Sequence, residues 1–552
     1  MRSDLRAPVL GLEPTVDAIA SHRRRARQWI QWLSDHCWLI TALASAIVAA
    51  VGFRGGDFAA QDYRVWIFRT HGFLVWDVNW YGGHSDLGYS VLFPAVGAVL
   101  GTVPATAVAC VISTILWGRL VGREGAAAVV SRLWFSLLIV GDLIIGRAPF
   151  ACSVAAALGA ILAVRADRRL LALLAALTAS LFSPLGAFFL LLVAAAWLPS
   201  LGWRRTLPLG GAVIGVAVAG ILGDGGWFPF PWTAFVGQLV IVAVGLAITP
   251  REWRTMRRAL VFYGIACVPL FLLPNPVGGN MARFASIVVG PLAAYVLLRS
   301  GRVKLLAALI VPLVAFQLQP VVGAVTAAAG DLSRKPQYYA GMLRYLEQHQ
   351  QPPSRVEIPF TLNHWEATYV AEKVPLARGW ERQIDLALNA ELYHPLTAAE
   401  YLTWLRANAI RYVALSDAPL DAGGKAEGAL LRHPPPYLKQ VYADPHWRIW
   451  QVIGATPLAE GVGTISALAA NGFTVESPRV GVTLVRLRWS PYWHVDSGTG
   501  CFVRTPDGWT DVIQLQPGQL KVSLRLAESQ ECTANQVREV GMNPAILDQS
   551  GP

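Results

Sequence analysis

Long apolar runs fill residues 38–329, and a mixed pattern of polar and apolar positions follows over residues 334–552. A helix needs about 20 mostly apolar residues to cross a bilayer. The pattern therefore predicts a multi-pass α-helical membrane domain over residues 36–330. The expected spans lie near residues 36–53, 105–119, 125–141, 148–164, 169–183, 184–200, 206–222, 235–249, 259–273, 284–298 and 305–323.

The last part of the chain has the patterns of a soluble protein. Residues 331–454 are expected to form an α/β domain. Its helices are expected at 336–348 and 397–408, and its strands at 355–358, 411–415 and 447–452. Residues 455–552 alternate polar and apolar positions between Gly, Pro and Asp turns, which predicts a β-rich, sandwich-like domain. The clearest alternating runs lie at 480–489, 501–504 and 520–526.

Composition agrees with a membrane protein and adds an orientation. Hydrophobic residues make up 54% of the chain and charged residues only 15%, whereas soluble domains are about 25% charged. Much of the arginine behind the formal charge of +11 sits in clusters between apolar runs. Such clusters mark cytoplasmic loops rather than a nucleic-acid surface, so no nucleic-acid partner is expected. They lie at residues 23–27, 119–123, 165–169, 204–205, 251–258 and 299–304.

With these clusters in the cytoplasm, eleven spans place the N-terminus inside and the C-terminal domains outside. Residues 1–35 form a basic cytoplasmic segment, and no cleavage site follows the first apolar run, so we expect that span to be retained. Residues 54–104 form a long first outer loop. If segment 90–100 of this loop were a further span, the basic cluster at residues 165–169 would lie outside instead of in the cytoplasm. We therefore expect this segment to be an interfacial helix. Cys501 and Cys532 of the external part could pair in a disulfide.

The few charged side chains on the predicted outer face indicate a site for chemistry. Asp142 and Arg147 stand in apolar surroundings, where ionisable groups tend to face each other or a polar cavity. They form either an ion pair that caps two helices or part of an outer cavity in which carboxylates and arginines converge. A carboxylate in such a cavity can take a proton from a hydroxyl, and guanidinium groups can hold a phosphate.

The first outer loop carries W-Y-G-G-H at residues 80–84 and Y-S-x-L-F-P at residues 89–94. Asp57 follows the first span directly, and Asp142 lies on the outer face after the third. This layout resembles the GT-C superfamily of polytopic membrane glycosyltransferases, which use polyprenyl-phosphate sugars. The W-Y-G-G-H loop is most similar to uncharacterised, actinobacterial-type members. The resemblance covers the predicted membrane domain and implies a bacterial cytoplasmic (inner) membrane location.

The resemblance implies roles for several of these residues. Asp57 corresponds to the first-loop acid and would be the catalytic base, with Asp62 as the alternate, and Asp142 corresponds to a second-loop acid. Arg283, after a Gly-Gly-Asn turn, and Arg147 would contact the donor phosphate. The superfamily's tandem acidic pair is absent here, which leaves open whether a divalent cation, Mg²⁺ or Mn²⁺, is a cofactor.

Aromatic and polar residues in both parts are candidates for binding the sugar or the acceptor, because aromatic faces stack on sugar rings and polar groups bond the hydroxyls. Each of them could instead serve loop structure or domain packing. In the first loop they are His71, Asp77, Trp80, Tyr81 and His84. In the α/β domain they are Trp365, Trp380, Glu381 and Arg382.

The implied activity is transfer of a hexosyl or pentosyl group, with inversion, from a polyprenyl-phosphate donor. The acceptor would be an extracytoplasmic glycan, lipid or protein, and membrane lipids would surround the enzyme. A transporter or flippase of lipid-linked glycans is one alternative, and an inactive GT-C-like scaffold of cell-envelope assembly is another. Transporters commonly contain repeats related by symmetry, and the sequence has no such repeat.

Overall fold

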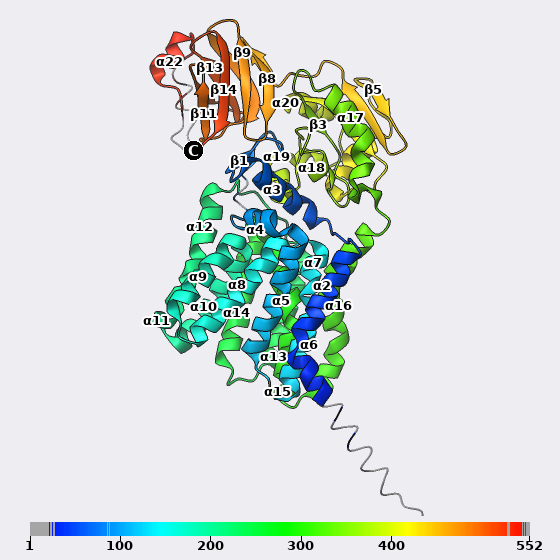
Figure 1. The fold of residues 1–552 in the computed structure, drawn as a ribbon, viewed down its shortest axis with the longest axis vertical. Coiled ribbons are helices and arrows are strands. Elements are labelled where there is room, and N and C mark those ends of the chain that lie inside the picture. Colours follow the sequence, from blue (N-terminus) through cyan, green and yellow to red (C-terminus); the bar gives the residue numbers. More distant parts are fainter. Residues whose placement is uncertain are drawn as a thin grey trace, which may run out of the picture.

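The fold is given by a computed structural model that describes residues 28–85, 87, 89–526, 530–543, 545 and 547, together with Ser21 and Arg25. Most of the basic segment predicted over residues 1–35 lies outside the described residues. The described chain forms a helical bundle, and two β-containing domains lie at one end of that bundle (Figure 1).

Within the described part of the chain, eight helical segments are long and apolar enough to cross a membrane, or nine if the bent pair of residues 28–35 and α2 (Cys37–Ala50) is one span. Two shorter apolar helices are α9 (Arg169–Phe182) and α13 (Trp232–Ile248). The fold is therefore compatible with a multi-pass membrane protein, and every predicted span lies on one of these helices. The eight segments are α5 (Thr102–Val121), α6 with α7 (Gly125–Leu138, Val140–Ile145), α8 (Ala148–Arg165), α10 (Pro184–Leu201), α11 to α12 (Trp203–Leu222), α14 (Arg254–Leu272), η2 with α15 (Gly278–Met281, Ala282–Arg299) and α16 (Val303–Ala328).

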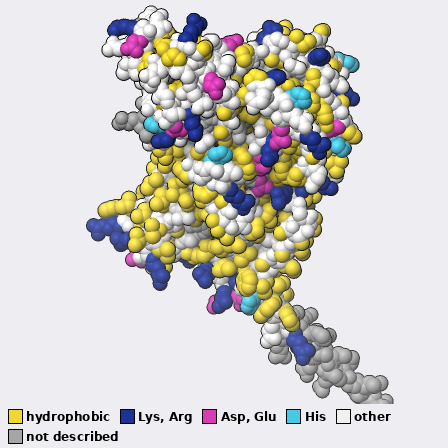
Figure 2. All heavy atoms as spheres, turned by 45° about the horizontal axis from the view of Figure 1, so that its top comes forward, with side chains coloured by type: hydrophobic (Ala, Val, Ile, Leu, Met, Phe, Trp, Pro, Cys, Tyr) yellow, Lys and Arg dark blue, Asp and Glu magenta, His cyan; other side chains and the backbone are white. Residues whose placement is uncertain are grey.

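Small residues let the bundle helices pack closely, as is usual in apolar surroundings. Ala160 and Ala163 of α8 share a core with Ala172 of α9. A Cβ on Gly186 of α10 would lie 1.9 Å from the Ser153 hydroxyl oxygen of α8. Many Leu, Ile and Val side chains are exposed on the outside of the bundle, where Figure 2 shows a broad apolar belt.

The predicted first outer loop is largely structured. It contains α3 (Asp57–His71), strands β1 (Trp76–Asp77) and β2 (His84–Ser85), and α4 (Phe93–Leu100). α4 lies within the segment expected to form an interfacial helix, and it packs against α3 at the end of the bundle that faces the β-containing domains (Figure 1). The sequence pattern does not predict α3, because buried residues surround this helix on most sides instead of forming one apolar stripe.

The α/β domain has a four-stranded sheet of order β3-β4-β6-β5. β3 runs parallel to β4, and the other pairs are antiparallel. Both predicted helices and all three predicted strands are present. The elements are η4 (Pro336–Tyr339), α17 (Ala340–Gln348), β3 (Arg355–Glu357), α18 (Glu366–Tyr369), α19 (Arg382–Leu388), η5 (Ala390–Tyr393), α20 (Ala398–Ala407), β4 (Ile410–Ser416), α21 (Lys425–Leu431), β5 (Leu438–Ala443) and β6 (Trp447–Val452).

The C-terminal region has two antiparallel four-stranded sheets, of order β12-β13-β10-β7 and β11-β14-β9-β8. Their facing side chains form one core, which includes Val485, Phe502 and Leu520. Cys501 and Cys532 form a disulfide between β12 and the segment before α22 (Ala534–Glu539). The strands are β7 (Ala459–Gly461), β8 (Thr464–Ala469), β9 (Gly472–Ser477), β10 (Gly481–Arg488), β11 (Trp493–Ser497), β12 (Gly500–Arg504), β13 (Trp509–Gln514) and β14 (Gly518–Leu524).

Candidate active site between the bundle and the α/β domain

A cavity of about 620 Å³ lies where the helical bundle meets the α/β domain. Its wall includes Asp57 at the start of α3, Arg147 in the turn before α8, and Arg283 in the first turn of α15. Arg382 and Tyr393 contribute to the wall from the α/β domain. Residues that are far apart in the sequence therefore face one space.

Close contact between two glycine-containing turns brings Asp57 to this cavity. The Gly55 N–H donates a hydrogen bond to the Ile144 carbonyl oxygen at 3.1 Å. Gly146 has a φ of +98°, and a Cβ there would lie 2.4 Å from the Phe58 nitrogen. Only glycine fits such a position readily. The turn that begins α3 is thereby packed directly on the turn that begins α8.

Two acids and two arginines form the polar centre of the site, which we call the cavity cluster: Asp57, Asp142, Arg147 and Arg283. Arg283 Nη2 lies 3.7 Å from Asp57 Oδ2, and Arg147 Nη1 lies 3.7 Å from Asp142 Oδ1. Both distances are longer than a hydrogen bond. In the described part of the chain, the buried atoms Asp142 Oδ2, Arg147 Nε and Arg283 Nε make no hydrogen bond. Since buried polar atoms are nearly always bonded, the cavity cluster has unused capacity for a polar ligand.

Tyr89 belongs to the same surroundings, although the sequence analysis does not identify it as a site residue. It lies near both Arg147 and Arg283. The guanidinium carbon of Arg64 lies 4.8 Å from the centre of its ring. Tyr89 is the first residue of the Y-S-x-L-F-P motif, which was the one signal in the sequence that pointed to it.

The cavity cluster does not fit a divalent cation. Mg²⁺ and Mn²⁺ are bound mainly by several oxygen ligands. Among the residues that the structure describes, no three His, Cys, Asp or Glu side chains come together in a metal-binding group. The charged neighbours of Asp57 and Asp142 include guanidinium groups, which repel a metal ion.

Asp62 and His71 share α3 with Asp57 but face other surroundings. Asp62 lies about 140° around the helix from Asp57, and it pairs with Arg54 at 2.9 Å. His71 lies at the far end of α3, about 21 Å along the helix axis, where its Nδ1 contacts the Thr70 hydroxyl at 2.7 Å. Neither residue is part of the cavity wall. The geometry therefore favours Asp57 over Asp62 as the acid that meets a ligand.

The W-Y-G-G-H motif joins the first outer loop to the α/β domain and does not line the cavity. The Trp80 indole N–H donates to the Ala367 carbonyl at 2.9 Å, and the Tyr81 hydroxyl donates to the Gly379 carbonyl at 2.5 Å. Gly82 has a φ of +72°, and a Cβ there would lie 2.5 Å from the Arg355 guanidinium. Trp80 and Tyr81 thus pack against the α/β domain, and neither is part of the wall of this cavity.

Asp77 and His84 are also buried in this joint. The Tyr63 hydroxyl donates to Asp77 Oδ2 at 2.6 Å, and the His84 ring stacks on Trp80 at 5.1 Å. Burial raises the pKa of Asp77 to about 7 and lowers the pKa of His84 to about 3. Both effects favour neutral groups inside a packed joint, so the structure gives these residues a role in holding the loop.

The two tryptophans proposed for sugar binding in the α/β domain are packing residues as well. Trp365 is fully buried and stacks on Tyr369 at 5.3 Å. Trp380 stacks on His364, with ring centres 3.3 Å apart. Neither ring forms part of the cavity wall. Packing between the domain and the bundle is the alternative that the sequence left open. It accounts for the positions of both tryptophans.

Glu381 and Arg382 are adjacent in sequence but differ in position. Glu381 pairs with Arg64 of α3 at 2.6 Å and thereby ties the α/β domain to the first outer loop. Arg382 lines the cavity, where its guanidinium donates to Asp421 at 2.5 Å and to the Tyr393 hydroxyl at 3.1 Å. Of the residues proposed for sugar or acceptor binding, Arg382 is the one in the cavity wall.

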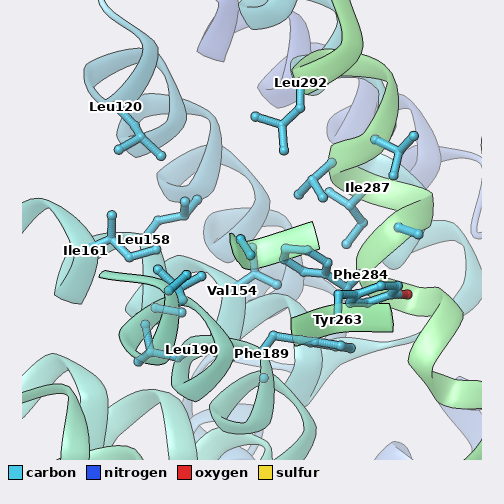
Figure 3. A pocket seen from close by; sticks show the side chains of 18 of the residues that line it. Leu120, Val154, Leu158, Ile161, Phe189, Leu190, Tyr263, Phe284, Ile287 and Leu292 are labelled. Atoms are coloured by element: carbon cyan, nitrogen blue, oxygen red, sulfur yellow. The ribbon is translucent and has the colours of Figure 1, made fainter. Parts of the chain in front are cut away.

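A second cavity, of about 400 Å³, lies inside the bundle and has an almost entirely apolar wall. Side chains such as Leu158, Leu190 and Tyr263 from different helices surround it (Figure 3). On α15, Phe284 lines this apolar cavity, whereas its neighbour Arg283 lines the polar cavity. Adjacent residues in one turn of α15 therefore face the apolar cavity and the polar cavity.

These two cavities and the residues around them are the features that bear on function. Comparison of the chain with models of known protein families found no match, and comparison with curated proteins found none either.

Proposed function

We propose that this protein is a membrane glycosyltransferase that moves a sugar, with inversion, from a polyprenyl-phosphate donor to a hydroxyl of an extracytoplasmic glycan, lipid or protein. The observation that carries the proposal is the meeting of Asp57 with Arg147 and Arg283 in one cavity, directly beside an apolar cavity in the bundle. The GT-C-like layout of the first outer loop supports the same activity.

In this proposal eleven helices span a bacterial cytoplasmic membrane, the N-terminus is cytoplasmic, and both β-containing domains lie outside. The distribution of arginine supports that orientation. Figure 2 shows Lys and Arg side chains along the rim of the apolar belt that lies away from the β-containing domains. Arginine is enriched on the cytoplasmic side of membrane proteins, so the polar cavity would face outward.

Asp57 would act as the general base. It takes the proton of the acceptor hydroxyl while the hydroxyl oxygen attacks the anomeric carbon of the donor sugar. The bond from the anomeric carbon to the phosphate oxygen breaks on the opposite side, and its electron pair leaves with the polyprenyl phosphate. Arg147 and Arg283 would stabilise the charge that develops there through paired hydrogen bonds. A phosphate leaving group held in this way needs no separate general acid.

The apolar cavity offers a place for the isoprenoid chain of the donor. Because Arg283 and Phe284 face the two cavities from one turn of α15, a phosphate at Arg283 would have apolar walls next to it. Burial of isoprene units in this space contributes affinity without contacting the sugar. Arg382 and Tyr393 line the other side of the polar cavity, where the acceptor would approach.

Membranes that contain the protein, incubated with a panel of radiolabelled polyprenyl-phosphate hexoses and pentoses, test the proposal. Asp57→Asn should lower transfer by roughly 10²- to 10⁴-fold, the range for loss of a general base, and should keep binding of unlabelled polyprenyl monophosphate. Asp62→Asn, on the same helix outside the cavity, is the matched control.

If Asp57→Asn transfers sugar at the wild-type rate, Asp57 is not the general base. If the purified wild-type protein does not bind polyprenyl monophosphate, the proposed class of donor is wrong. Binding of that probe without transfer from any sugar in the panel would favour the inactive scaffold.

A further inference from the structure

A third cavity, of about 770 Å³, lies at the end of the bundle away from the cavity cluster. It is formed by the turn between α13 and α14 and the turn between α15 and α16. Four arginines and one glutamate line it, a net formal charge of +3. We call it the basic pocket, and these residues are Arg251, Arg257, Arg299, Arg302 and Glu252.

The arginines of the basic pocket differ in how they are held. Arg257 is half-buried, and its Nη1 donates to the carbonyl oxygens of Leu246 and Thr249 at 2.5 and 3.0 Å, which closes the end of α13. Arg251, Arg299 and Arg302 are exposed. Among the described residues of the wall, Glu252 alone is acidic. The pocket thus presents an excess of guanidinium groups from two separate turns.

Apolar surface borders the basic pocket. Val244 on α13 is 39% exposed, and Val303 at the start of α16 is 58% exposed. Trp253 in the pocket wall contacts Tyr295 at 6.1 Å between ring centres, and such aromatic pairs are typical of membrane–water interfaces. A ligand in this pocket therefore meets arginines with its polar head and exposed apolar helix faces with the rest.

We propose that the basic pocket binds the phosphate of an anionic phospholipid in the cytoplasmic leaflet. Guanidinium groups bond phosphate oxygens in pairs, and basic pockets between membrane helices at the cytoplasmic side suit such headgroups. The proposal rests on the membrane orientation given above and is independent of glycosyl transfer.

Arginine is abundant at this end of the bundle, which explains why the pocket is positively charged. It does not explain why four arginines line one cavity. Arg204 and Arg205 at α11 provide the contrast. They lie at the same end of the bundle (Figure 1), and Arg205 pairs with Asp167 at 3.6 Å. Neither lines the basic pocket. A phosphate in the basic pocket would bridge two turns, and binding to the folded state alone would stabilise the bundle.

Native mass spectrometry of the full-length protein in neutral detergent tests this assignment, with phosphatidylglycerol and phosphatidylcholine as probes. The wild type should bind phosphatidylglycerol more tightly. The double variant Arg299→Gln/Arg302→Gln should lose roughly tenfold or more of that affinity, because each basic residue near an anionic headgroup contributes about fivefold. Arg204→Gln/Arg205→Gln removes the same charge outside the pocket and should lower the affinity clearly less than the pocket variant does.

An unchanged affinity in the pocket variant, or an equal loss in the control, would overturn the assignment. Displacement of phosphatidylglycerol by millimolar inorganic phosphate would identify a free anion as the ligand. That result would overturn the assignment of a phospholipid to the pocket. If the double variant does not fold, Arg302→Lys keeps the charge but not the paired donors, and it should bind less tightly than the wild type. Polyprenyl monophosphate binding, measured in the same samples, should not change in any of these variants.

Discussion

Two groups of arginine and carboxylate side chains in this molecule can be compared. The first group is the cavity cluster, and the second is a buried group in the α/β domain, which we call the Arg378 cluster: Arg378, Asp385, Glu427 and Glu357. Arg378 donates to both carboxylate oxygens of Asp385 at 2.9 and 2.6 Å and to Glu427 at 2.6 Å. All four of its side chains are at most 1% exposed.

The cavity cluster uses the same residue types with different geometry. Its two ion pairs are 3.7 Å long, and in the described chain it has no shorter one, whereas the Arg378 cluster combines one pair of this length, with Glu357, with short hydrogen-bonded pairs to Asp385 and Glu427. Both clusters contain buried polar atoms that make no hydrogen bond within the described chain. The Arg378 cluster is buried inside its domain, whereas Asp57, Arg147 and Arg283 of the cavity cluster line an open cavity. Tyr393 lies between the Arg378 cluster and the cavity wall, since its hydroxyl donates to Asp385 and accepts from Arg382, which lines the cavity. The two clusters therefore differ in their short hydrogen-bonded pairs and in their access to a cavity, and not in residue type.

The largest effect is expected from Arg378→Met. Removal of the guanidinium leaves three buried acidic side chains without their cation, and loss of one partner of a buried pair costs about 3–5 kcal/mol. Thermal denaturation of the purified protein should show a large drop in stability. Arg432→Met, at an exposed position of the same domain, is the control and should change stability by about 0.5 kcal/mol or less. Equal stability of the two variants would show that the Arg378 cluster is not a stabilising group.

A smaller effect, dependent on pH, is expected from Glu366→Gln. Glu366 is buried and accepts hydrogen bonds from Thr361. Its basic neighbour is His364, whose Nδ1 lies 3.7 Å from Glu366 Oε1, and no arginine of the described chain pairs with it. Burial raises its pKa from 4.5 to about 7. Between these pH values the folded state holds a proton that the unfolded state has lost, so stability falls as the pH rises, by roughly 3 kcal/mol in total.

The glutamine variant stays neutral and should lose less stability between pH 5 and pH 8 than the wild type. Denaturation curves across this interval measure the difference. Parallel pH dependences for the two proteins would show that Glu366 does not titrate in this range, and the contrast between carboxylates with and without an arginine partner would then not hold.

A further effect is expected on binding rather than on stability. Arg147→Gln and Arg283→Gln should each weaken polyprenyl monophosphate binding by roughly 10- to 100-fold, because hydrogen bonds to a charged group contribute about 1.5–3 kcal/mol. The melting temperature should fall less than in Arg378→Met, since both pairs are longer than a hydrogen bond. A stability loss like that of Arg378→Met, with binding intact, would make the cavity cluster a structural group.

The smallest effect is expected from Asp62→Asn. Arg54 and Asp62 form an ion pair whose arginine side chain is 45% exposed, and such pairs contribute about 0–1 kcal/mol. Stability and donor binding should both stay close to those of the wild type. A loss of transfer as large as that of Asp57→Asn would move the general base from Asp57 to Asp62.

Much of this arrangement could be predicted from the sequence. Hydropathy locates the bundle helices, and alternation locates the sandwich strands, because both patterns are local. Topology also predicts that Asp57, Asp142, Arg147 and Arg283 share one face, since turns at one end of a bundle lie at one level. The structure brings these four together.

The remaining features depend on contacts between distant parts of the chain. The W-Y-G-G-H motif has the composition of a sugar site, but Trp80 and Tyr81 are held by residues of the α/β domain. Likewise, the burial of α3 comes partly from α4 and α18, and no periodicity in its own sequence indicates this. Arg382 and Tyr393 reach the cavity only because the α/β domain docks on the bundle. No local pattern encodes that docking.

The most direct measurement is an electron cryo-microscopy structure of the full-length protein with bound polyprenyl monophosphate. The account predicts phosphate density in hydrogen-bond contact with Arg147 and Arg283, within reach of Asp57, and isoprenoid density along the apolar cavity beside Phe284. Phosphate density elsewhere, with an unoccupied cavity cluster, would contradict the central claim that this cluster is the site of glycosyl transfer.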